Sequence, residues 1–151
     1  PTQLLVLILV AVIVAFLLNK TIYGRYVRAI GGNEEAARVA GINVDRYKVV
    51  SYMLCSMLAV IAGFVLTSRT TTGDPTLGNS FEMNAIASCV IGGASLNGGV
   101  GTVFGTIIGA VIIGIINNIL NLANISTYYQ YVVRGGIIIL AVIFNSKKKR
   151  K

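Results

Sequence analysis

The side chains that most often carry out enzyme chemistry are scarce in this sequence. Its 151 residues include no histidine, five acidic residues and two cysteines. Without imidazole, neither Ser–His nor Cys–His catalysis nor an imidazole-held metal is available. The cysteines, Cys55 and Cys89, lie far apart inside apolar runs, as is typical of small buried hydrophobic side chains rather than a disulfide or a Cys-x-x-Cys site. The residues therefore predict no catalytic, metal or cofactor site.

The composition instead indicates a membrane protein. Apolar residues make up 55% of the chain and charged residues 12%, against about 25% charged residues in a typical soluble domain. Lipid admits only helices and closed barrels, because every backbone polar group must be paired internally. No segment shows the alternation of apolar and polar residues that a barrel wall needs. We therefore expect an all-α, polytopic transmembrane helix bundle.

Five apolar segments are candidates for crossing the membrane, and a full crossing takes about 20 residues. They are Gln3–Leu18, Val49–Ser68, Phe81–Ser95, Gly101–Leu122 and Tyr131–Phe144. The second and fourth are long enough by themselves, whereas the third and fifth need flanking residues to complete a crossing. We favour five crossings over a re-entrant third segment, because five crossings keep the basic residues on one side.

The basic residues define that side. With five crossings, the polar stretch 21–48 and the basic tail 145–151 lie together, and an excess of Lys and Arg marks the cytoplasmic face. That face carries Lys20, Arg25, Arg28, Arg38, Arg46, Lys48 and the five residues 147–151, and the other face carries Arg69 and Arg134. The net charge of +8 therefore indicates how the chain is oriented in the lipid membrane, and it does not indicate a nucleic-acid-binding surface.

The polar stretch contains a complete short helix with its capping residues. Asn33 is a suitable N-cap, the acidic residues that follow it suit the helix dipole, and Gly41 fits the position just after the C-cap. The small residues would let another surface approach closely. The residues of this helix and its caps are Asn33, Glu34, Glu35, Ala36, Ala37, Arg38 and Gly41. Glu34 and Arg38 are spaced for an i, i+4 ion pair. The helix is either a capped loop resting on the membrane surface or a docking element for a cytoplasmic partner.

Glycines recur in the fourth apolar segment. Gly101, Gly105 and Gly109 repeat every four residues, which predicts one helix face where a neighbouring backbone can approach. A nucleotide-binding reading fails, because residues 99–105 read GxGxxxG rather than GxGxxG and no P-loop motif occurs.

Ionisable and amide side chains near the other face form the remaining candidate site. Glu82 and Arg134 each lie near the end of an apolar segment, and Asn117 and Asn118 lie near the end of the fourth. Intramembrane charges are functional hints. Structural anchoring is the simpler interpretation, and an outer gate or substrate path is the alternative.

Three motifs together closely resemble the permease subunit of ribose-type sugar ABC importers. They are GRYVRAIGGNEEAARVAGI, NAIASCVIGGASLNGGVGTVFGTIIGAVIIGIINNILNL and YYQYVVRGGIIILAVI. The match covers essentially all of residues 1–151 and corresponds to the C-terminal half of such a permease, as the initial Pro1 also suggests. Arg134 stands where the family often has Lys.

The resemblance implies a non-catalytic transport subunit without cofactors. Its implied partners are a cytoplasmic ATP-binding subunit, an extracytoplasmic sugar-binding protein and a second permease copy. The loop with Gly32, Asn33 and the helix up to Gly41 resembles the element that docks on the ATPase. Alternatives are a secondary transporter or channel, disfavoured because the candidate charges lie away from the midplane, or a permease for autoinducer or branched-chain amino acids.

Overall fold

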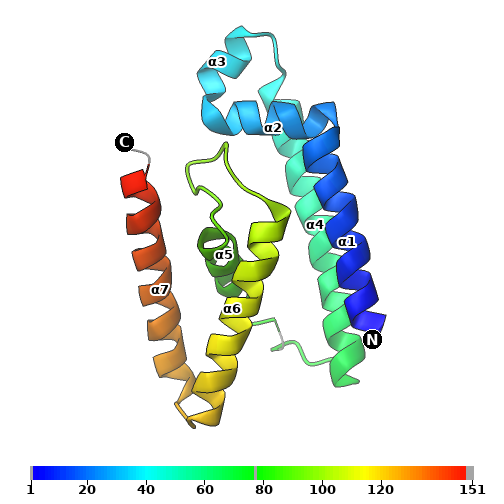
Figure 1. Cartoon of the computed structure of the whole chain (residues 1–151). Coiled ribbons are helices and arrows are strands. Elements are labelled where there is room, and N and C mark those ends of the chain that lie inside the picture. Colours follow the sequence, from blue (N-terminus) through cyan, green and yellow to red (C-terminus); the bar gives the residue numbers. More distant parts are fainter. Residues whose placement is uncertain (1, 77, 149–151) are drawn as a thin grey trace. The chain divides into compact units, whose positions relative to one another are not determined.

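A computed structural model describes residues 2–76 and 78–148, and within them the regular secondary structure is helical, without strands (Figure 1). The helices are α1 (Thr2–Lys20), α2 (Ile22–Gly32), α3 (Glu34–Val39), α4 (Val44–Thr70), α5 (Phe81–Ile91), α6 (Val103–Leu122) and α7 (Thr127–Lys148). The all-α prediction is confirmed. The expected basic tail begins inside α7, and residues 149–151 lie outside the described residues.

Three helices are long and apolar enough to cross a membrane, namely α1, α4 and α6. Two shorter apolar helices, 81–91 and 127–143, accompany them, so the polytopic character is confirmed and the count of five crossings stays a prediction. The third apolar segment was expected to be helical up to Ser95, but α5 ends at Ile91. Gly92 is its C-cap and Gly93 has a φ of +89°, a left-handed value that glycine adopts at no steric cost.

The chain divides into two compact units, one ending at Asn79 and one beginning at Ser80. In the first unit, α2 lies across the ends of α1 and α4 (Figure 1). The sequence analysis did not anticipate α2 as a helix. The turn into it is tight, because a Cβ added at Gly24 would lie 2.0 Å from the carbonyl oxygen of Leu18. The side chain of Thr21 caps α2 by accepting from the amide of Gly24.

Tyrosines attach α2 to α4. The hydroxyl groups of Tyr23 and Ser51 are 2.6 Å apart, within hydrogen-bonding distance. The rings of Tyr26 and Tyr47 meet edge to face, with centroids 5.3 Å apart, an arrangement that aromatic pairs prefer. These contacts fix α2 against the first two turns of α4.

In the second unit, α5 packs against both α6 and α7 and lies between them (Figure 1). Its contact with α6 is backbone on backbone. A Cβ at Gly105 would lie 2.1 Å from the carbonyl oxygen of Gly92, and one at Gly109 would lie 2.0 Å from that of Ser88. Only glycine permits this approach, as in other small-residue helix contacts.

Gly101 requires a correction, because it is not part of this helix face. The helix begins at Val103 with Thr102 as its N-cap, whose side chain accepts from the amide of Gly105. Gly101 lies in the preceding loop, where an added Cβ would make ordinary contact with Ala94 at 3.4 Å. The glycine that faces Gly105 is Gly92, the C-cap of α5, which the spacing argument did not single out.

Candidate functional site

The short helix α3 is fixed at both ends by its own capping residues. The side-chain oxygen of Asn33 accepts from the amide of Ala36 at 3.0 Å. At the other end, the amide of Gly41 donates to Arg38 and that of Ile42 donates to Ala37, each at 3.1 Å. This pattern is a Schellman motif, and Gly41 supplies its left-handed residue with a φ of +84°. The sequence placed these caps correctly.

Charged side chains connect α3 to the start of α4. Lys48 donates to Glu34 at 2.7 Å, and Arg38 reaches Glu34 at 3.3 Å and Asp45 at 3.4 Å. The hydrogen bond from Lys48, joined by the one from Arg38, lowers the pKa of Glu34 below its ordinary value of 4.5. The predicted pair of Glu34 and Arg38 is therefore present as one member of a four-residue network.

The two faces of α3 differ sharply in exposure. Ala37 is 5% exposed and Val44, at the start of α4, is 2% exposed, so α3 packs through Ala37 onto this chain itself. Val39 is 87% exposed, and Glu35 and Ala36 are exposed as well. Ala37 was expected among the docking residues. That expectation is corrected, because its methyl group is already buried inside the chain and is not available to a partner.

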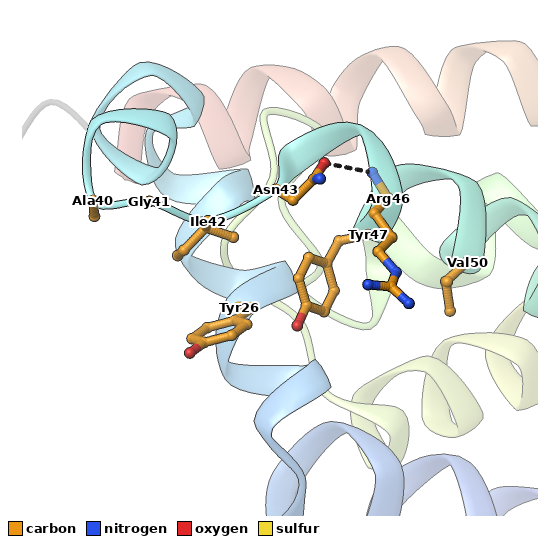
Figure 2. Close-up of a pocket in the computed structure, with 8 residues that line it drawn as sticks. All are labelled: Tyr26, Ala40, Gly41, Ile42, Asn43, Arg46, Tyr47 and Val50. Carbon is orange, nitrogen blue, oxygen red and sulfur yellow. Dashed lines mark hydrogen bonds between the residues drawn. The ribbon is translucent and has the colours of Figure 1, made fainter.

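A pocket of about 510 Å³ lies beside α3, where α2 and α4 meet (Figure 2). One wall consists of the turn after α3, with Gly41 and Ile42, and another of Tyr26 on α2. From the first turns of α4, Tyr47 and Arg46 complete it. Figure 2 also shows Asn43 capping α4, with its side-chain oxygen accepting from the amide of Arg46 at 3.3 Å.

A polar cluster links α6 to α7 in the second unit. The guanidinium of Arg134 donates to the side-chain oxygen of Asn117 at 3.1 Å and to that of Gln130 at 3.5 Å. Gln130, which is 5% exposed, donates in turn to the side chain of Asn121 at 2.9 Å. Arg134 also lies 5.6 Å from the ring centroid of Tyr131. The charge is thus held by amide oxygens and an aromatic ring.

The structure brings together only part of the predicted outer set. Asn117 and Arg134 are in contact, whereas Glu82 and Asn118 are exposed and take no part in a side-chain hydrogen bond or ion pair among the described residues. Gln130 belongs to the cluster and was missed. Its position four residues before Arg134 was an available signal. On α5, the side-chain oxygen of Asn84 is buried without a partner within the described chain.

Comparison of the sequence with known proteins identifies the family of this chain. A family model described as "branched-chain amino acid transport system / permease component" matches residues 2–142. The chain belongs to this permease family. The resemblance inferred from the motifs, to the permease subunits of ABC importers, is thereby confirmed. No solved structure matches this permease chain.

Individual relatives of the permease chain are sugar permeases by name. It is 46% identical over 151 residues to the xylose transport system permease protein of Haemophilus influenzae. It is 49% identical over 148 residues to the ribose import permease protein of Bacillus subtilis, and 44% identical over 149 residues to that of Escherichia coli. The alignments cover at least 98% of this chain but only 40–46% of these relatives. The chain therefore spans less than half the length of the curated relatives that it matches.

Proposed function

We propose that the chain is part of the membrane-spanning permease subunit of an ATP-driven importer for a monosaccharide such as ribose or xylose. The observation that carries the proposal is its identity of 44–49% to ribose and xylose permeases over nearly all of its length. The chain itself hydrolyses no ATP, and a separate cytoplasmic ATP-binding subunit supplies that reaction.

Within this subunit, α3 is the element that docks on the ATPase. Two features support the assignment: the capping bonds and ion pairs that hold α3, and the exposed apolar side chain of Val39. Burying a valine side chain stabilises a contact by roughly 1.5–3 kcal/mol. Gly32, Asn33, Glu34, Glu35, Ala36, Arg38 and Gly41 give this docking loop its shape and charge.

The ion pairs also give α3 a mechanical connection to the membrane. Lys48 and Asp45 belong to the first turns of α4, and α4 is one of the helices long enough to cross. A displacement of α3 by the ATPase would therefore be passed to α4 through Glu34 and Arg38, with Ala37 as the packed pivot. Coupling of this kind needs no chemistry in the permease.

The rest of the assembly follows from the same proposal. The chain lies in the plasma membrane with its C-terminus cytoplasmic, pairs with a second permease copy and receives sugar from an extracytoplasmic binding protein. Asn117 and Arg134 contribute to the outer end of the substrate path or its gate, where hydroxyl groups of a sugar would find both donors and acceptors. Glu82 and Asn118 are the exposed members of that outer region.

The test changes the exposed valine of α3. Val39→Lys in the full-length permease places a cation at the last residue of the helix, where the helix dipole tolerates it. We expect normal membrane insertion, loss of ATPase co-purification by tenfold or more, and loss of sugar uptake. The reason is that an unpaired charge buried in an interface costs several kcal/mol, and about 1.4 kcal/mol is tenfold in affinity.

Two further variants make the result interpretable. Thr72→Lys adds the same charge beyond the other end of α4 and should leave co-purification and uptake near the wild-type level. Ala37→Arg should instead disorder the loop itself, because Ala37 is buried, and protease sensitivity of residues 32–48 should report this. If Val39→Lys binds the ATPase and transports sugar normally, α3 is a linker and the docking assignment fails.

A further inference from the structure

The pocket beside α3 lies at the start of a membrane-crossing helix. The apolar stretch of α4 begins at Val49, three residues after Arg46. Val50, which lines the pocket, therefore belongs to the apolar part of the helix, while Arg46 and Tyr47 precede it. Tyrosine and arginine at this position are typical of the boundary between headgroups and acyl chains. The pocket thus lies at the depth where lipid headgroups are found.

Its electrostatics favour an anion. The acidic residues nearby, Glu34 and Asp45, are held by Arg38 and Lys48. The guanidinium of Arg46 makes no ion pair or side-chain hydrogen bond within residues 2–76 and 78–148. In Figure 2 the side chains of Arg46, Tyr47 and Val50 extend from the same side of α4. An unpaired cation, two tyrosine rings and the apolar side chains of Ile42 and Val50 therefore line one cavity.

The geometry points to a binding site for an anionic phospholipid. Its phosphate would meet the guanidinium of Arg46, the headgroup would lie against the rings of Tyr26 and Tyr47, and an acyl chain would pass Val50. Arginine binds phosphate oxygens through paired, charge-assisted hydrogen bonds. The proposed site requires α4 to lie in the membrane, and membership of a permease family supports that location. The proposal does not depend on which solute is transported.

A protein partner fits the pocket less well than a lipid does. The surface proposed above for the ATPase is centred on Val39, which does not line the pocket, and of the residues named for the docking loop only Gly41 belongs to the pocket wall. The apolar stretch of α4 that continues from Val50 needs an apolar neighbour along its length, and its side chains Met53, Met57 and Val60 are 59–63% exposed. A lipid supplies the anion and the apolar neighbour in one molecule.

The experiment uses delipidated full-length permease and native mass spectrometry. Phosphatidylglycerol and phosphatidylcholine are titrated separately, and the affinity of the tightest bound lipid is compared between Arg46→Gln and Arg25→Gln. Arg25 is a matched control, because it is exposed on α2, lies outside the pocket and makes no side-chain hydrogen bond or ion pair among the described residues. A basic residue at an anionic membrane surface contributes about fivefold to binding. We expect Arg46→Gln to weaken phosphatidylglycerol binding by at least fivefold, and Arg25→Gln to change it by less than twofold.

Further arms separate the possible ligands. Arg46→Lys keeps the charge but loses the paired hydrogen bonds, so its binding should lie between those of the wild type and Arg46→Gln, which guards against an effect of misfolding. Phosphatidylcholine should bind equally weakly to all variants. Equal losses in Arg46→Gln and Arg25→Gln would mean diffuse charge attraction and overturn the site. Displacement of phosphatidylglycerol by millimolar inorganic phosphate would overturn the lipid assignment in favour of a soluble anion. Unchanged lipid binding together with lost ATPase co-purification in Arg46→Gln would assign the pocket to the ATPase instead.

Discussion

The backbone contact between α5 and α6 predicts a large effect from a single methyl group. In Gly109→Ala, the new Cβ would lie 2.0 Å from the carbonyl oxygen and 2.9 Å from the carbonyl carbon of Ser88. A carbon atom and a carbonyl oxygen in contact are normally at least about 3.3 Å apart. The helices would therefore have to separate by about 1.3 Å at this point. Because the opposing atoms are backbone, no side-chain rotation can relieve the clash.

The magnitude follows from comparable changes in packed interiors. Overfilling a close-packed contact costs about 1–3 kcal/mol. Ser88 is itself buried, and Gly92 meets Gly105 one turn away, so the separation would loosen a second contact as well. We expect Gly109→Ala to lower the free energy of unfolding by about 1–3 kcal/mol.

The same helix provides a matched control. A Cβ added at Gly114 meets nothing within 4 Å. Alanine is favoured over glycine within a helix by about 0.5–1 kcal/mol, so Gly114→Ala should be neutral or slightly stabilising. The measurement is reversible unfolding of the full-length permease in mixed micelles titrated with SDS. If the two variants have the same unfolding free energy, Gly109 does not face α5 as described and the packing argument is refuted.

Two further predictions concern the first unit. Because the pKa of Glu34 is lowered in the folded protein, its contribution to stability is present above about pH 4.5 and is lost as the pH falls further. Amide exchange in α3, corrected for intrinsic rates, should therefore rise below that pH in the wild type and in Glu35→Gln but show no such step in Glu34→Gln. For topology, in a cysteine-free background of intact cells, Gly73→Cys should react with an impermeant thiol reagent and Glu35→Cys should not. The opposite labelling pattern would overturn the orientation taken from the basic residues.

Local features of the fold could be predicted because their causes are local. Asn33 and Gly41 act within one turn of α3, so residue type and spacing were enough to place both caps. The apolar segments likewise placed α1, α4 and α6 to within a few residues. The helix α2 was missed because its arginines and glycines made residues 21–48 look like a loop. Its apolar side chains, such as Ile22 and Tyr26, form only one stripe along the helix.

Features that depend on two elements meeting could not be read from spacing. The repeat Gly101, Gly105 and Gly109 identified a face, but the helix starts at Val103 and the true partner of Gly105 is Gly92. Which glycine meets which is set by the turn between α5 and α6. Ala37 was a similar case, because a small residue on a short helix suits a partner and the chain's own packing equally well. Only the burial of Ala37 within the folded chain, at 5% exposure, decides for the second.

The polar cluster around Arg134 shows that the turn between two helices decides which of their side chains meet. Asn117 and Asn121 lie four residues apart on α6, and Gln130 and Arg134 lie four residues apart on α7, so each pair occupies one face of its own helix. Because α6 and α7 run antiparallel, the two residues nearer the connecting turn, Asn121 and Gln130, lie opposite one another. The two residues farther from the turn, Asn117 and Arg134, do the same. The connecting turn includes Asn124 at a φ of +55°, a left-handed conformation that asparagine tolerates better than most residues. The two polar pairs were therefore visible in the sequence. The conformation of the connecting turn decides that they face each other and that the guanidinium of Arg134 is hydrogen-bonded to Asn117.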